Sequence, residues 1–415
     1  MTAPMTTIRA HVATALTLIS SVALPGCALD SEPPPETEEL GEVRQAATSK
    51  DPVAADVAYA AKKKMFLVVW DEGTPGSSDV MGSLVRPNGT TFRGPFAIST
   101  ATGSQSLPRV ASDGTSFFVV WQDGRNNGDD VYGTRVLATG QVSHPSGVVI
   151  TQGSSFATAP DIGYSNGNYL AVWSDDRAAD FDIYGTRVDT SGNVLDPSGV
   201  LISGTAGSEA YPAVEGNDVK FLVGWSSFAP GSSSWDIEGR IVKLTPTLSS
   251  GALITIGTSP EHEFKIAFGS DGDNFCAAWQ NGPLSDAEIN VAPVWEWGGV
   301  GGVTAVTPPT GQTAIRPSVA HVRNRYVATW NQLPQSGTQN GRLYGQSLAA
   351  CDPVGAPFLI QKLRSQDRGL EVASDATNAM TVWADINPSG QHCTVCGDIR
   401  TETGTSVFPE FPIRP

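Results

Sequence analysis

Acidic residues recur in the loops that follow two tryptophans, and they are the first candidates for chemistry. One loop contains Asp123 and Asp130, and the other contains Asp175 and Asp182. Carboxylates that converge from one loop could coordinate Ca²⁺ through their oxygens. Neither loop matches the D-x-[DN]-x-[DN]-G pattern of a calcium loop, and aspartates before a strand commonly accept hydrogen bonds from their own backbone. We therefore favour a structural role and expect no metal or other cofactor, with Ca²⁺ as the alternative, and keep the four aspartates as candidate binding residues.

Three tryptophans are candidates for ligand contact because they break a regular spacing that seven other tryptophans obey. They are Trp235, in a long loop rich in serine, and Trp295 with Trp297, in a strand that ends at a run of glycines. Exposed aromatics of this kind could stack on a glycan or anchor a protein partner. Packing within a longer loop is the other interpretation.

Cysteines suggest cross-links rather than a metal centre. Cys393 and Cys396 form a C-T-V-C motif beside His392, which could be a local disulfide or half of a zinc site. A zinc site needs two more ligands, and no second paired motif exists, so we predict a disulfide or free thiols. Cys276 lies in an apolar run and is predicted to be a small core residue.

Motifs for catalysis are missing from the sequence. The five histidines fall singly, and no H-E-x-x-H, G-x-S-x-G or G-K-[ST] motif occurs. Strings such as Ser112–Thr115 approach the Asp box of sialidases but stand at the wrong distance from their tryptophan. We assign no catalytic residue, although an active site assembled from distant loops stays as an alternative because a fold does not settle a function.

A repeat of 51 to 54 residues organises the chain and must position these residues. Its most regular member is a tryptophan that closes an apolar run, at Trp70, Trp121, Trp173, Trp225, Trp279, Trp330 and Trp383. Each unit contains four short strands separated by turns rich in Gly, Asn, Asp and Ser, as in antiparallel hairpins. The second strand is apolar on both faces, so neighbouring sheets must cover it. We predict an all-β fold, a seven-bladed β-propeller with four-stranded antiparallel blades.

The N-terminus precedes the repeats and has the features of an export signal. An apolar run from Val12 to Leu24 is too short to span a bilayer, and Leu24–Cys27 resembles the lipobox of bacterial lipoproteins. An ordinary secretory signal with a chance cysteine is the alternative. We predict acylation of Cys27, which would anchor the protein to a membrane without spanning it.

The predicted organisation has three parts. Residues 1–26 are a lipoprotein signal peptide, 27–49 an acidic, Pro-rich disordered tether, and 50–415 the propeller. Predicted blades cover about 50–100, 101–152, 153–204, 205–258, 259–309, 310–361 and 362–415.

Two of the units resemble the repeats of TolB-type (WD40-like) propellers. The resemblance rests on a D-G turn, an aromatic strand, a D-R loop and an I-Y strand, seen at Asp113–Gly114, Trp121, Asp123–Arg125 and Asp130–Tyr132 and in the next unit. These blades are longer than the TolB norm, and tryptophan replaces the smaller aromatic. The resemblance implies the propeller fold and a secreted bacterial repeat lipoprotein, and it carries no catalytic residue across.

The absence of a catalytic motif favours binding over catalysis, and the net charge bears on the kind of partner. A net charge of −16 argues against nucleic acid as a partner. We expect a monomeric, lipid-anchored, extracytoplasmic module of the bacterial cell envelope that binds or scaffolds a protein or a glycan. The alternative is a carbohydrate-active enzyme, a glycoside hydrolase or lyase, with acids at the central channel. We further expect the ligand on the face that carries the acidic loops, because the turns on the other face are too short to shape a site.

Overall fold

The computed structural model describes residues 52–414 except 75, 127, 152–155, 179, 245–246, 284, 307–311, 335–340, 364–367 and 385–394. This part of the chain folds into strands β1 to β29 and contains no helix. The predicted signal peptide, tether and Cys27 lie outside the described residues. No helix long and apolar enough to cross a membrane occurs within the described ranges.

The strands group into seven sheets in chain order. The first is β1 (Pro52–Ala60), β2 (Met65–Thr74), β3 (Ser77–Val85) and β4 (Thr91–Ser99). The second is β5 (Gln105–Ser112), β6 (Ser116–Asp123), β7 (Asp130–Leu137) and β8 (Val148–Val149). The third is β9 (Ala157–Ser165), β10 (Asn168–Asp175), β11 (Asp182–Asp189) and β12 (Val200–Ser203). The fourth is β13 (Ser208–Gly216), β14 (Phe221–Phe228), β15 (Asp236–Lys243), β16 (Ser249–Ser250) and β17 (Ile254–Gly257).

The remaining three sheets follow the same pattern. The fifth is β18 (Glu263–Ser270), β19 (Phe275–Asn281), β20 (Glu288–Val294) and β21 (Thr304–Val306). The sixth is β22 (Gln312–Val322), β23 (Arg325–Pro334), β24 (Arg342–Ala349) and β25 (Asp352–Lys362). The seventh is β26 (Arg368–Ser374), β27 (Ala379–Ala384), β28 (Val395–Arg400) and β29 (Ser406–Arg414).

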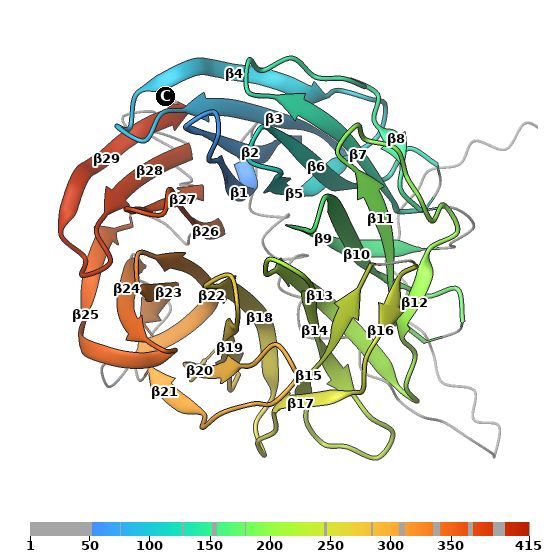
Figure 1. Cartoon of the computed structure of the whole chain (residues 1–415), viewed down its shortest axis with the longest axis vertical. Helices are drawn as coiled ribbons and strands as arrows, with labels where there is room; N and C mark the ends of the chain where they lie inside the picture. Colours follow the sequence, from blue (N-terminus) through green and yellow to red (C-terminus); the bar gives the residue numbers. More distant parts are fainter. Residues whose placement is uncertain are drawn as a thin grey trace, which may run out of the picture. The chain divides into compact units, whose positions relative to one another are not determined.

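Each sheet is an antiparallel meander, and the sheets form a ring of seven blades. The innermost strands β1, β5, β9, β13, β18, β22 and β26 each contact the next, and β26 contacts β1 (Figure 1). Strand order follows the sequence in every blade, apart from a split outer edge in the fourth, where β16 and β17 both pair with β15. The prediction of a seven-bladed, four-stranded, all-β propeller is confirmed.

Second strands form the buried layer between blades. The seven repeating tryptophans all lie on these strands and are at most 1% exposed. Apolar clusters join the second strand of one blade to its neighbour, as Val68 of β2 joins Met380 and Val382 of β27. A strand buried on both faces carries apolar residues at every position, which is why no period-2 alternation is visible there.

Ring closure takes place between contiguous blades, without exchange of a strand between the two ends of the chain. The indole Nε1 of Trp70 donates to Glu72 Oε2 at 2.9 Å, and Arg414 Nε lies 2.9 Å from the same oxygen. Arg414 is in β29 and Glu72 is in β2. The last strand is therefore tied to the first blade by an ion pair in addition to apolar packing.

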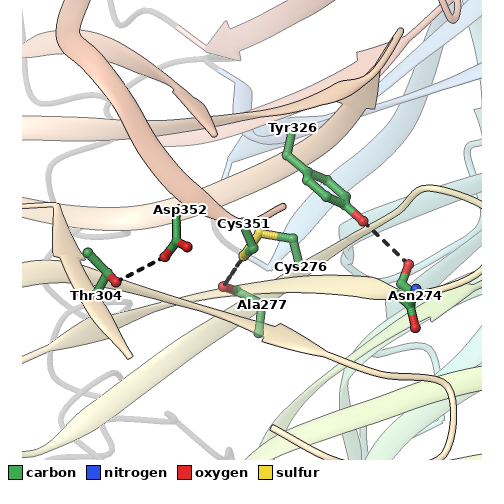
Figure 2. Close-up of a disulfide and its surroundings, with 7 residues drawn as sticks. All are labelled: Asn274, Cys276, Ala277, Thr304, Tyr326, Cys351 and Asp352. Carbon is green, nitrogen blue, oxygen red and sulfur yellow. Dashed lines mark hydrogen bonds between the residues drawn. A yellow bond between two sulfur atoms is a disulfide. The ribbon is translucent and has the colours of Figure 1, made fainter. Parts of the chain in front are cut away.

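A disulfide links two neighbouring blades (Figure 2). Cys276 of β19 is bonded to Cys351, which lies between β24 and β25, with Cα atoms 5.3 Å apart. Both residues are buried, so the prediction that Cys276 is a core residue holds, but its pairing was not anticipated. Cys396 is also disulfide-bonded, whereas Cys393 lies outside the described residues, so the predicted pair stays a prediction.

Candidate functional site

The two faces of the ring carry different connections. In an antiparallel meander, the links from second to third strand and from each blade to the next lie on one face, here named the loop face. Links from first to second and from third to fourth strand lie on the opposite face, here named the turn face. The acidic loops 123–130 and 175–182 are therefore on the loop face, and the connection 295–303 between β20 and β21 is on the turn face.

The aspartates that follow two of the tryptophans form a bonded unit, here named the Trp-Asp-Arg clasp. Trp173 Nε1 donates to Asp175 Oδ2 at 2.8 Å, and Arg177 donates to both oxygens of Asp175 at 2.8 and 2.6 Å. The guanidinium lies over the Tyr184 ring at 4.1 Å and donates to the Ser198 carbonyl at 2.8 Å. One clasp thus joins the second strand, the third strand and the connection beyond it.

The preceding blade repeats this clasp with Trp121, Asp123, Arg125 and Tyr132. The W-x-D-x-R and I-Y parts of the repeat are therefore explained by packing and hydrogen bonding. Other blades vary the acceptor, since Trp279 Nε1 donates to Glu263 Oε1 at 2.8 Å. Trp225 Nε1 and Trp330 Nε1 are buried with no hydrogen-bond partner among the described residues.

The candidate aspartates are mostly committed to these contacts. Asp123 and Asp175 are fully buried, and their oxygens accept from tryptophan and arginine. Asp130 is half-buried and accepts from Asn126 at 3.2 Å, and burial raises the pKa of Asp182, with Asp180 and Asp175 adding to the effect. No group of three His, Cys, Asp or Glu side chains that could hold a metal ion occurs within the described ranges.

Trp235 requires a correction. It is only 4% exposed and packs against Phe228 and Phe264, with ring centroids at 5.3 and 5.9 Å. The expectation of an exposed platform at Trp235 is wrong, because aromatic residues from β14 and β18 cover its ring.

The innermost strands bring charged side chains together at the centre of the ring, here named the axial cluster: Asp56, Arg109, Asp161 and Glu371. Arg109 Nη1 lies 3.0 Å from Glu371 Oε1, and its Nε lies 4.0 Å from Asp161 Oδ1. Burial raises the pKa of Asp56 to about 8 and that of Asp161 to about 6, although the positive charge of Arg109 opposes both shifts. Sequence reasoning missed this cluster, although the residue types at one aligned position of the first strands could have shown it.

Bonds from this position also connect neighbouring blades. Asp56 Oδ2 accepts from the Val110 backbone at 2.7 Å, and Asp161 Oδ2 accepts from the Val214 backbone at 2.7 Å. Ser318, at the equivalent place in β22, accepts from the Val372 backbone at 3.1 Å and donates to Glu371. The axial cluster is therefore at least a structural link between blades.

The most exposed tryptophan lies on the turn face. Trp297 is 74% exposed and stacks on Trp295, with ring centroids 5.6 Å apart and planes 7° from parallel. Trp297 borders an open groove of about 520 Å³ between the fourth and fifth blades, here named the Trp297 groove. Its lining consists of Lys220, Ile241, Lys243, 249–254, Glu296, Trp297 and Gly298.

The loop that carries the two indoles is tied down on both sides. The Trp295 backbone N–H donates to the Gly299 carbonyl and the Gly298 N–H donates to the Trp295 carbonyl, which closes a tight turn with Gly298 at φ 93°. Lys220 Nζ donates to the Glu296 carbonyl at 3.3 Å and lies 3.2 Å from its carboxylate. The indoles are thus preorganised before any ligand binds.

This groove overturns one expectation about the turn face. Trp295 and Trp297 follow the end of β20 instead of lying within a strand, and the connection that holds them borders the Trp297 groove. Third-to-fourth strand links such as 138–147, 190–199 and 295–303 are long, although the first-to-second turns are short. The sequence marked Trp297 as unusual, but it missed Lys220 and Lys243, which lie far apart along the chain and gave no motif.

Comparisons with known proteins agree on the fold. No family model matches the chain, and no curated protein matches it. An ulvan lyase of polysaccharide lyase family PL25 is similar in structure, with a TM-score of 0.57 and 10% identity over 86% of this chain and 95% of that chain. An acylaminoacyl peptidase from Pyrococcus horikoshii gives a TM-score of 0.50 and 10% identity over 90% of this chain and 54% of that chain. The chain spans about half the length of that peptidase, and at these identities the likenesses show the fold alone.

Proposed function

We propose that the protein is a glycan-binding module that binds its ligand in the Trp297 groove, on the turn face of the fourth and fifth blades. The exposure of Trp297, in parallel contact with Trp295, carries the proposal. An indole left 74% in water and held in a fixed orientation offers a flat apolar surface to the C–H faces of a sugar ring. A polysaccharide lyase is among the proteins of similar fold, which is compatible with a glycan as ligand.

The module is proposed to be extracytoplasmic and anchored to a bacterial membrane through a lipid on Cys27. Support comes from the sequence before the propeller, where an apolar run ends in a small residue directly before the cysteine. The acidic, Pro-rich segment 30–47 is proposed to act as a tether between the anchor and the propeller, on the evidence of its composition.

A glycan array tests the binding function. We expect the protein to bind a subset of glycans and the Trp297→Ala variant to lose at least tenfold in affinity, in keeping with the loss of one stacking aromatic. Phe92→Ala is the matched control, because Phe92 is an exposed aromatic on β4, far along the ring. Equal binding by wild type and Trp297→Ala, or an equal loss in Phe92→Ala, would contradict the site.

The axial cluster supports a second candidate, a carbohydrate-active enzyme. A carboxyl group with a pKa raised toward neutrality, as for Asp56 and Asp161, is what a general acid requires. Hydrolysis or cleavage of polysaccharides by wild type, and its loss in Asp161→Asn with the fold intact, would favour this candidate. No turnover by wild type across a panel of polysaccharides would count against it.

A further inference from the structure

The lysine side chains beside Trp297 indicate which class of glycan the groove would bind. The lining of the Trp297 groove contains two lysines, Lys220 and Lys243, and one acid, Glu296. The local side-chain charge is therefore positive, although the whole chain carries −16. The groove is therefore a place where an anion meets a net positive charge on an otherwise acidic protein.

The two lysines have different roles. Lys220 lies 3.2 Å from the Glu296 carboxylate, so its charge is compensated and its contacts fix the loop that carries the indoles. Lys243 ends β15 and is exposed, and its ammonium has no hydrogen bond or ion pair with any described residue. Lys243 is thus the cation that a ligand could reach at low cost, because no existing ion pair must break.

The same groove is lined by polar as well as apolar groups. Ser249 and Ser250 of β16 are exposed and offer hydroxyl groups, while Ile241 and Ile254 continue into the apolar cluster between the fourth and fifth blades. The lining of the groove therefore offers both an aromatic surface and an ammonium with hydroxyls. A glycan with a carboxylate or sulfate substituent could contact both the indole and the ammonium, since an ammonium binds such anions as a point charge.

We infer that the Trp297 groove selects an anionic glycan, with Trp297 contacting a sugar ring and Lys243 contacting a carboxylate or sulfate on the same chain. This inference rests on the proposed glycan-binding function and specifies its ligand. Specificity would come from charge, because a neutral chain gains the stacking contact but leaves Lys243 with water alone.

Matched pairs of glycans provide the test. Oligogalacturonate and its methyl-esterified form share one backbone and differ in charge, as do sulfated and desulfated forms of one polysaccharide. We expect wild type to bind at least one charged form about tenfold or more tightly than its neutral partner at low salt, with the preference shrinking as salt rises. Lys243→Gln should abolish the preference, and Lys243→Arg should retain it. Lys63→Gln, on an exposed turn of the same face in the first blade, is the control and should change nothing.

The outcomes separate the two proposals. Trp297-dependent binding of neutral and charged forms with equal affinity would keep the glycan-binding function and overturn the charge selection. The same conclusion would follow if Lys243→Gln kept the full preference. A panel in which no glycan binds would overturn both.

Discussion

A tryptophan buried between two blades brings an N–H donor into a place where water cannot accept from it. In the third blade the acceptor is Asp175, and the charge that this brings into the interior is matched by Arg177, which is itself stacked on Tyr184. Each group satisfies the next, so the buried carboxylate is tolerated because every partner is present. The recurrence of the clasp in two blades reflects this mutual dependence.

Removing one charge from the clasp should therefore destabilise the protein strongly. Asp175→Asn keeps the shape but replaces one oxygen, which accepts from two donors, with an NH2 group that cannot accept, and it leaves Arg177 without a counter-charge. We expect a loss of about 3 kcal/mol in the free energy of unfolding, measured by urea denaturation with an unchanged m-value. Asp180→Asn, in the exposed part of the same loop, should cost less than about 0.5 kcal/mol. Similar stability of both variants would show that the clasp does not stabilise the fold.

At this scale the sequence predicted burial better than it predicted partners. The periodic tryptophans were recognised as packing residues because every unit repeats them, and all are buried. Trp235 was misjudged because Phe264, which covers it, lies in the next blade, and no local pattern connects the two. Lys243 could not be identified as a candidate ligand contact, since a single lysine at a strand end forms no motif and its place beside Trp297 appears only in the folded chain.

Strands and turns were predictable to different degrees across a blade. Each second strand contains an apolar run that ends in tryptophan, so its position followed directly from the sequence, as for Phe117–Trp121 in β6. Outer strands vary from two residues in β8 to eleven in β25. An outer strand has a solvent-exposed edge, so its length depends on local loops and on neighbouring blades, for which short sequence patterns carry little information.

The disulfide between neighbouring blades should contribute to stability and resist reduction. It joins β19 to the turn before β25 across a separation of 75 residues, which restricts a long loop of the unfolded chain. We expect the Cys276→Ala/Cys351→Ala variant to lose about 2 to 4 kcal/mol in the free energy of unfolding.

Because the disulfide is buried, its rate of reduction reports how often the two blades that it links separate. Because both cysteines are at most 1% exposed, a reductant should reach them only when the fifth and sixth blades separate. Mass-spectrometric thiol counting at 276 and 351 under native conditions should show slow reduction that urea accelerates. Rapid reduction of this pair in the folded protein would contradict the packing between these blades.

Over the whole ring, the two faces separate acidic loops from the tryptophan groove. The loop face contains Asp123 and Asp175, whose charges are used internally, whereas the turn face exposes Trp297 beside Lys243. Ring architecture was accessible from the sequence because seven similar units cannot bury their sheets alone. Convergence at the axis was missed, because Asp56, Arg109 and Glu371 belong to distant units and meet only in the closed ring, so only an alignment of the first strands could have shown it.

Closure also places Glu215 of β13 among the innermost strands, and its protonation should make stability depend on pH. Burial raises the pKa of Glu215 to about 8 from its ordinary 4.5, with the negative charge of Asp161 adding to the shift. Between these values the folded state holds a proton that the unfolded state has lost. The contribution is therefore fully present below about pH 4.5 and is lost as pH rises to about 8.

Glu215→Gln should remove this dependence, because the amide resembles the protonated acid in shape and does not ionise. Between pH 5 and 8 the free energy of unfolding should fall more steeply in wild type than in the variant. The difference in slope should be smaller than about 1.4 kcal/mol per pH unit, which is the slope for the release of one full proton. Urea midpoints measured at four pH values would show the difference, with Glu261→Gln, an exposed residue, expected to follow wild type. Parallel profiles for wild type and Glu215→Gln would mean that Glu215 ionises in the folded protein as it does in water, and that its place among the innermost strands is hydrated.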